Sequence, residues 1–269
     1  MSTFTTEACP LRYSFMTYNV WGDKHWPARS PSLQQVFNAS RPDVLMLQET
    51  TPVIIETIGS VLPRHHSVDE TEMEEAEEGW ERSGVDIMWN SDLFTLVNAG
   101  FKKLGIVDHQ DRGLFWIRLA SKVNPSVTFL VCTVQMPESN CEEEITTGVN
   151  VRIKTTMNIC KALRSILKSK EPIIFGGDFN DDFHPLRILG EEFGFIDCFE
   201  SLDLVPCHTH PVRPSDYEEE MKPSRTIDWI MTVLPSNCRV LSVYVKTVRG
   251  GWPPASHHMP VISIVEFGI

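Results

Sequence analysis

The chain is constrained most by a series of short apolar segments of strand length, several of which follow one another without an intervening helix. These segments are residues 85–89, 94–98, 114–119 and 127–133. Apolar residues recur at helical spacing in 151–169, and 51–62 is a second expected helix. Runs of strands mixed with helices predict an α/β fold with two mixed sheets, rather than one doubly wound sheet, in a single domain.

The composition is that of a soluble globular protein, with 42% hydrophobic and 22% charged residues in a chain of 269. The first residues contain no apolar run of secretory length, and no window is long enough to span a membrane. The seven cysteines form no CxxC pair, and an odd number without a secretion signal predicts reduced thiols. We therefore expect an intracellular protein, and a monomer.

The formal net charge of −12 repels polyanions at long range. It predicts weak binding of long duplex nucleic acid, which requires basic surface. It does not exclude a phosphate ester, because a metal ion screens acidic groups locally. Much of the excess lies at 69–81, and this charge run predicts a flexible, solvated loop.

Polar side chains occur where several apolar segments end. They are Asn19, Glu49, Asp178, Asn180, Asp228, His257 and His258. In α/β sheets, ligands gather beyond strand ends. Carboxylate and amide oxygens suit a hard cation such as Mg²⁺, whereas a histidine with an aspartate suits a phosphoryl oxygen.

Most of these residues, taken singly, also have an ordinary explanation. Asn19 suits a turn, and Glu49 suits an exposed helix start. Asp228 lies between Ile227 and Trp229, where a buried carboxylate costs several kcal/mol unless it is paired. The joint pattern favours a functional site.

Six segments, in this order along the chain, resemble the endonuclease/exonuclease/phosphatase superfamily, whose members include deoxyribonuclease I. They are TYNVWG (17–22), PDVLMLQET (42–50), SGVDIMWN (83–90), GGDFND (176–181), RTIDWI (225–230) and SHHMPV (256–261). The resemblance implies a four-layer sandwich of two mixed β-sheets flanked by helices. It also implies one catalytic domain over 1–269, and a divalent-metal-dependent enzyme that hydrolyses a phosphodiester or phosphomonoester by in-line attack of water.

The resemblance assigns roles to the residues that match these segments. Glu49 is expected to be the principal ligand of Mg²⁺ or Mn²⁺, with Asn19 beside it. Asp178 is expected to position or deprotonate the attacking water, and Asn180 to orient that water or a phosphate oxygen. His258 is expected to bind the phosphate.

Two further expectations accompany these roles. Asp228 is expected to hold His258. The glycines at 176 and 177 are expected to let the backbone turn tightly beside the substrate.

Two positions depart from the family pattern. Gln135 stands where a histidine commonly contacts phosphate, and His257 stands where an aspartate often contributes to metal binding. Gln135 then becomes a candidate phosphate contact. His257 becomes either a nitrogen ligand that favours Mn²⁺ over Mg²⁺ or a residue that only packs. The alternative function is a non-catalytic or repurposed metal-binding protein on the same scaffold.

The segments NVWG and PDVLMLQETTP are most similar to the 5′-tyrosyl-DNA phosphodiesterase branch. The expected substrate is a phosphate ester: a nucleotide, a nucleic-acid end or a small phosphodiester. Four tryptophans are candidates for stacking on a base or ring, with packing as the alternative for each. They are Trp21, Trp26, Trp116 and Trp252.

Overall fold

The computed structural model describes residues 9–76, 80, 83–105, 112–212, 224–247 and 253–268, and its strands form two mixed sheets. The first sheet contains, in spatial order, β12 (Cys238–Val245), β13 (Val261–Phe267), β1 (Leu11–Asn19), β2 (Val44–Gln48), β5 (Val85–Asn90) and β3 (His65–Ser67). The second contains β10 (Ile196–Asp197), β11 (Asp228–Val233), β9 (Ile173–Asp178), β8 (Thr128–Gln135), β7 (Gly113–Ser121), β6 (Phe94–Lys103) and β4 (Met73–Ala76).

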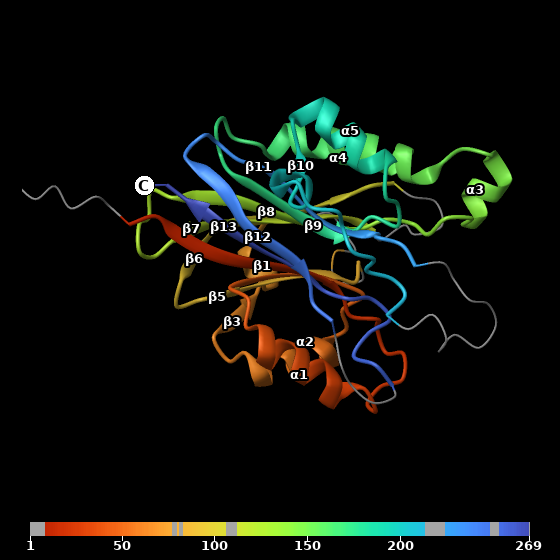
Figure 1. The fold of residues 1–269 in the computed structure, drawn as a ribbon, viewed down its shortest axis with the longest axis horizontal. Helices are drawn as coiled ribbons and strands as arrows, with labels where there is room; N and C mark the ends of the chain where they lie inside the picture. Colours follow the sequence, from red (N-terminus) through yellow and green to blue (C-terminus); the bar gives the residue numbers. More distant parts are fainter. Residues whose placement is uncertain are drawn as a thin grey trace, which may run out of the picture.

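Helices cover both outer faces of the stacked sheets. These helices are α1 (Ser30–Ser40), α2 (Pro52–Val61), α4 (Val151–Ile166) and α5 (His184–Phe193). Figure 1 shows α1 and α2 below the sheets and α4 and α5 above them, while the short α3 (Glu142–Thr147) projects from the body. The arrangement confirms the predicted α/β fold with two mixed sheets in a four-layer sandwich.

An aromatic cluster fills the space between the sheets near the start of β1. Tyr13 packs edge-on against Phe94 at 4.6 Å, and Phe129 lies 5.0 Å from Phe267 between ring centroids. Burying each large side chain contributes about 1.5–3 kcal/mol. Because β1 and β13 are antiparallel, Phe267 pairs with the start of β1, and Asn19 emerges at the other end of the strand. This aromatic cluster therefore lies at the opposite end of β1 from Asn19.

The two glycines before Asp178 lie inside strand β9, so the predicted tight turn at 176–177 is wrong. A Cβ on Gly177 would lie 2.5 Å from the carbonyl oxygen of Val134, and one on Gly176 would lie 2.6 Å from Met46 Cε. Both positions therefore serve close packing, of β9 against β8 and of β9 against the facing sheet. The chain turns after the strand, at Asn180, whose φ is 49°.

The acidic run at 69–81 contains regular structure where the charge pattern predicts a loop. Residues Glu70–Glu72 form a 3-10 helix, and the Asp69 side chain accepts hydrogen bonds from the amides of Thr71 and Glu72. Strand β4 then pairs in parallel with β6 at the sheet edge. Edge pairing uses backbone groups and does not require apolar side chains. Residues 77–79 and 81 of the run lie outside the described residues.

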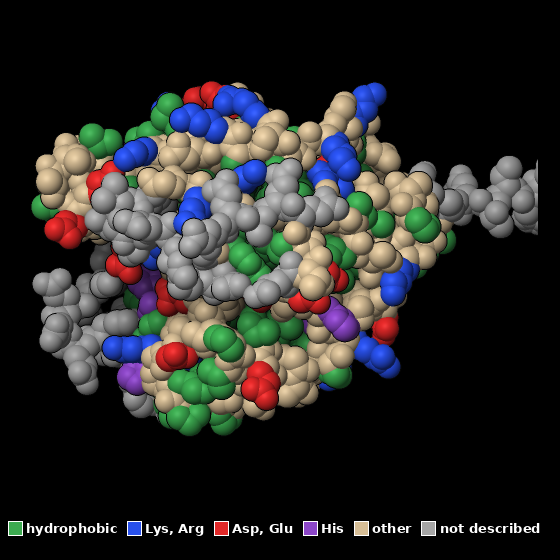
Figure 2. Space-filling model, turned by 180° about the vertical axis from the view of Figure 1, so that it is seen from behind, with side chains coloured by type: hydrophobic (Ala, Val, Ile, Leu, Met, Phe, Trp, Pro, Cys, Tyr) green, Lys and Arg blue, Asp and Glu red, His purple; other side chains and the backbone are tan. Residues whose placement is uncertain are grey.

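The oxidation state of the cysteines, the charged side chains on the surface and the length of the helices relate to the expected cellular location of the protein. All seven cysteines lie in the described part of the chain and are free. Figure 2 shows several Lys and Arg side chains along the side covered by α4 and α5, and acidic side chains scattered over the rest of this face. Within the described residues, no helix is both long and apolar enough to cross a membrane.

Replacing Gly177 with Ala should lower the free energy of unfolding by about 1–3 kcal/mol, because the added methyl group meets a backbone carbonyl that cannot move without disturbing the β8–β9 ladder. Gly59 on α2 has nothing within 4 Å of its Cβ position, so Gly59→Ala serves as the control and should stabilise by up to about 1 kcal/mol. Urea denaturation measures both. A Gly177→Ala protein as stable as the wild type would contradict the close-packing explanation.

Candidate active site

The polar residues predicted from strand ends come together where the two sheets end side by side. Asn19 ends β1 and Glu49 follows β2 in the first sheet. In the second sheet, Asp178 is in register with Gln135 on β8 and with Asp228 on β11. Three neighbouring strands of one sheet and two of the other therefore supply the site.

Glu49 is held by two amide side chains. Asn19 Nδ2 donates to Glu49 Oε1 at 2.9 Å, and Gln135 Nε2 donates to the same oxygen at 2.6 Å. The backbone of Glu49 is in the left-handed region with φ 54°, and its carbonyl accepts from the amide of Gly22 at 3.0 Å. Such a backbone costs about 1–3 kcal/mol and persists where its surroundings enforce it. Gln135, the candidate phosphate contact, thus also orients Glu49.

Asp178 is a buried carboxylate, with 1% of its surface exposed. Its Oδ2 accepts from Asn19 Nδ2 at 3.0 Å, and its Oδ1 accepts from the amide of Asn180 at 3.1 Å. Burial raises the pKa of Asp178 to about 7, and the charge of Asp228 adds to this rise while His258 opposes it. The carboxylate can therefore exchange a proton near neutral pH.

His258 forms a pair with Asp228, and both side chains are buried. The ring Nδ1 lies 3.0 and 2.8 Å from the two Asp228 oxygens, and Nε2 lies 3.9 Å from Asp178 Oδ2. Burial lowers the pKa of His258, but the charges of Asp228 and Asp178 outweigh it and raise the pKa to about 9. At neutral pH the ring is therefore an imidazolium with Nε2–H directed toward the site.

Asn180 completes this part of the site. It follows Asp178 by two residues and adopts a left-handed backbone, which asparagine tolerates better than most residues. Its Nδ2 donates to the carbonyl oxygen of Met136 at 2.9 Å. The side chain is thereby fixed between the ends of β8 and β9.

His257 lies in a cluster of rings. It stacks on Trp21 with 4.6 Å between ring centroids, and His210 and His258 lie beside it. Of the other tryptophans named as stacking candidates, Trp116 is buried, Trp26 lies against Arg29, and Trp252 is outside the described residues.

Sequence reasoning missed several residues that hold the site. The buried guanidinium of Arg29 donates to the carbonyl oxygens of Gly22, Lys24 and Ala255, and so joins the loop after β1 to the segment before His257. Ser256 Oγ donates to the backbone carbonyl of Asn19 at 2.7 Å and accepts from the amide of His258. Ser256 falls within the SHHMPV segment, but no pattern there or at Arg29 shows which carbonyl it bonds. Ala255 lies 226 positions from Arg29, and Asn19 lies 237 positions from Ser256.

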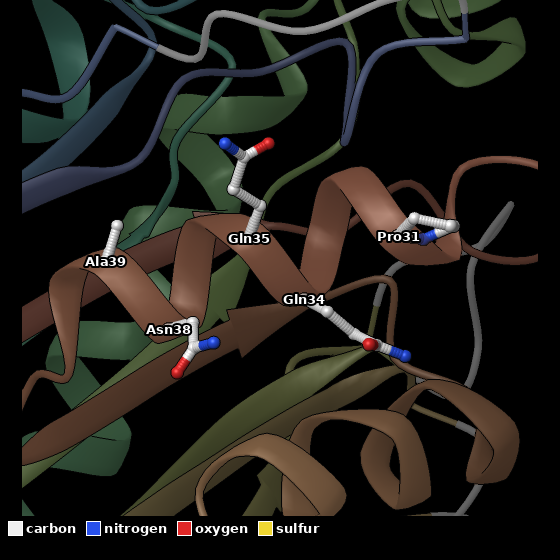
Figure 3. Close-up of a pocket in the computed structure, with 5 residues that line it drawn as sticks. All are labelled: Pro31, Gln34, Gln35, Asn38 and Ala39. Carbon is white, nitrogen blue, oxygen red and sulfur yellow. The ribbon is translucent and has the colours of Figure 1, made fainter.

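A surface hollow along α1 is lined by side chains of a different chemical kind from those at the strand ends. It is lined by Pro31, Gln34, Gln35, Asn38 and Ala39. Figure 3 shows Gln34 and Gln35 extending to different sides of the helix, so these amides do not converge on one point. The hollow contains no titratable side chain, and we place the candidate active site at the strand ends.

Solved structures match the chain along almost its whole length, whereas no protein-family model and no curated protein sequence matches it. An endonuclease/exonuclease/phosphatase family protein from Bacteroides thetaiotaomicron matches with a TM-score of 0.75 and 18% identity, over 97% of this chain and 100% of that chain. D. rerio TDP2, complexed with a single-stranded DNA product, matches with a TM-score of 0.75 and 14% identity over 94% and 98%. A mannosyl-6-phosphatase from B. thetaiotaomicron matches with a TM-score of 0.72 and 19% identity over 94% and 99%.

The chain has the endonuclease/exonuclease/phosphatase fold. The resemblance read from its six sequence segments is confirmed at the level of the fold. The agreement extends over nearly the full length of both chains.

The donor set at Glu49 fits a divalent cation. Both side-chain hydrogen bonds that the described residues donate to Glu49 end on Oε1, so its Oε2 keeps its lone pairs for a cation. Asn19 directs its Nδ2 to Glu49 Oε1 and Asp178 Oδ2, and its Oδ1 accepts from the backbone amide of Trp21 at 3.0 Å. An anionic carboxylate oxygen is the kind of ligand that Mg²⁺ prefers, with water completing the shell.

Replacing Asp228 with Asn should lower the pKa of His258 well below its value of about 9, because burial then disfavours the imidazolium with one fewer adjacent anion. NMR titration of the imidazole in metal-free protein measures this pKa. Asp92→Asn is the control, since Asp92 is an exposed partner of Arg64, and it should leave His258 unchanged. Equal His258 titrations in wild type and Asp228→Asn would contradict the charge pairing.

Proposed function

We propose that the protein is a divalent-metal-dependent phosphoesterase that hydrolyses its substrate by in-line attack of an activated water. The observation that carries the proposal is the convergence of Glu49, Asp178 and the His258–Asp228 pair at one end of the sandwich. The neighbours of known name act on phosphate esters, as a DNA product complex and a sugar phosphatase indicate.

Asp178 acts on the water. Its buried carboxylate has a pKa near neutrality, which suits a general base that accepts a proton at physiological pH. Asn180, fixed at the end of β9, orients the same water or a phosphate oxygen. Catalysis of this kind depends on holding the reacting atoms in position.

His258 acts on the phosphate. Its Nδ1–H is held by Asp228, so Nε2–H is directed at a phosphoryl oxygen as a charged hydrogen-bond donor. Asp228 positions the ring and keeps it protonated. Negative charge that develops on the phosphoryl oxygens is stabilised by the imidazolium, which is already in position.

Glu49 and Asn19 hold the metal, for which we propose Mg²⁺ or Mn²⁺. When bound, such an ion supplies Lewis-acid stabilisation of negative charge on phosphoryl oxygens. Gln135 orients the Glu49 carboxylate through its 2.6 Å hydrogen bond.

The substrate is proposed only as a class: a nucleotide, a nucleic-acid end or a small phosphodiester. The similar structures include both a protein bound to single-stranded DNA and a phosphatase of a sugar monoester, so they support a diester and a monoester alike. The net charge of −12 supports weak binding of long duplex DNA. The free cysteines support an intracellular location.

A non-catalytic metal-binding protein is the second candidate, favoured by Gln135, whose amide contacts Glu49 where a phosphate-binding histidine is common in the family. A substrate panel separates the two functions. Bis-p-nitrophenyl phosphate, p-nitrophenyl phosphate and short oligonucleotides are each assayed with Mg²⁺, Mn²⁺ or EDTA. Turnover that EDTA abolishes supports the enzyme, and no turnover on any substrate supports the binding protein.

Glu49→Gln should reduce metal-dependent turnover at limiting metal by at least about 10²-fold, because the amide preserves shape but removes the anionic ligand. The panel above provides the assay. Glu56→Gln changes an exposed acid on α2 in the same way and should leave turnover unchanged. Activity of Glu49→Gln within twofold of wild type, with an intact circular-dichroism spectrum, would eliminate the proposed metal site.

Asp178→Asn should reduce turnover by about 10²- to 10⁴-fold, and His258→Ala should cost a similar factor. The double variant His258→Ala/Asp228→Asn should be little slower than His258→Ala alone, because Asp228 acts through the imidazole. Single-turnover rates measure the cycle. Fully additive losses would show that Asp228 acts independently of His258.

A further inference from the structure

A group of three histidines lies beside the candidate active site. His210, His257 and His258 each offer a ring nitrogen, and these nitrogens lie within 4.8 Å of one another. The ring centroids of His210 lie 5.1 Å from His257 and 4.6 Å from His258, and the last two are 4.5 Å apart. Glu49 does not belong to this group of donors.

The backbone holds these rings together. The amide of Val212 donates to the carbonyl of His257 at 2.9 Å, and the amide of Met259 donates to the carbonyl of Thr209 at 2.7 Å. His210 is also joined to Arg225 by an isolated β-bridge. The segment that carries His210 is therefore fixed alongside the one that carries His257 and His258.

Two contacts orient the rings further. The His257 ring stacks on the Trp21 indole at an interplanar angle of 28°. Asp228 occupies Nδ1 of His258, so Nε2 is the nitrogen left for a ligand. A histidine that binds metal through one nitrogen usually donates from the other to a carboxylate, and Asp228 is already placed for that role.

We propose that His210, His257 and Nε2 of His258 form a site for a transition-metal ion of the Zn²⁺ type, separate from the oxygen site at Glu49. Three imidazoles with an open fourth position match a common zinc coordination. Zn–N distances of about 2.0 Å require the nitrogens to close to about 3.3 Å, which small rotations of the half-buried rings of His210 and His257 supply. Imidazole favours Zn²⁺, Co²⁺ or Ni²⁺ over Mg²⁺.

Occupancy of this site has a consequence for turnover, which rests on the proposed function. A metal on His258 Nε2 displaces the proton of that nitrogen into solvent and so removes the N–H that the phosphate is proposed to contact. Zn²⁺ then inhibits hydrolysis while Mg²⁺ at Glu49 supports it. The metal site itself does not depend on the protein being an enzyme.

Binding is tested by titrating Zn²⁺ into chelator-treated full chain in a large excess of Mg²⁺, with isothermal titration calorimetry as the readout. Wild type should bind one Zn²⁺ per chain at the cluster, and His210→Gln should weaken this binding by at least about tenfold. His208→Gln is the matched control, because His208 is an exposed histidine two residues away and should leave the affinity unchanged. Circular dichroism verifies that both variants are folded.

The coordination is tested with Co²⁺ under the same conditions. A four-coordinate nitrogen site gives intense visible absorption, which an octahedral oxygen site does not, and this absorption should be lost in His210→Gln and kept in His208→Gln. Equal Zn²⁺ affinities for wild type and His210→Gln, or a weak octahedral Co²⁺ spectrum in the wild type, would overturn the proposal.

The Zn²⁺ concentration that halves Mg²⁺-dependent turnover provides a separate test of Zn²⁺ binding at the histidines. It should rise at least about tenfold in His210→Gln, each protein being compared with its own rate without Zn²⁺. A chain without Mg²⁺-dependent turnover would refute the proposed function, while the calorimetry and the Co²⁺ spectrum still decide the histidine site.

Discussion

The burial of Asp178 at the end of β9 is the constraint on which the rest of the site depends. A carboxylate with 1% exposure is costly unless partners compensate it, and the partners come from three separate parts of the chain. Asn19 arrives from the other sheet, Asn180 from the following turn, and His258 from the segment before the last strand. The buried Asp178 carboxylate therefore requires the two sheets to end side by side, because its partners come from both.

The close approach of the sheets satisfies this requirement. Gly176 and Gly177 precede Asp178 directly, and neither position has room for a side chain between β8, β9 and the facing strand β2. The absence of side chains there brings β9 near enough to the first sheet for Asn19 to reach Asp178 and Glu49 with one amide group. Packing and site geometry are thus set by the same strand.

A second layer of contacts keeps the loops in place around these strand ends. The buried guanidinium of Arg29 donates hydrogen bonds to three backbone carbonyls. These bonds join the loop after β1 to the segment before His257. Ser256 joins that segment to the end of β1 through the Asn19 carbonyl. Because buried donors must be satisfied, these residues fix the positions of His257 and His258 without contacting a substrate themselves.

Much of the fold and the membership of the site followed from the sequence, because both depend on local patterns. Apolar segments of strand length predict two mixed sheets, and polar residues at their ends identify Glu49, Asp178 and His258 as neighbours. The contacts made by individual side chains did not follow. Gln135 reaches Glu49, and the acidic run pairs with a sheet edge, because each outcome depends on a partner far away in the chain.

The sequence by itself determined the types of the main strands and helices, the order of the motifs and the kinds of donor atom at the strand ends, since periodicity and residue chemistry act over a few positions. Only the tertiary structure decided that the glycines serve sheet packing and that His257 lies beside His210 and Trp21. The physical reason is that these outcomes require distances between segments, and such distances are set by the packing of the whole sandwich.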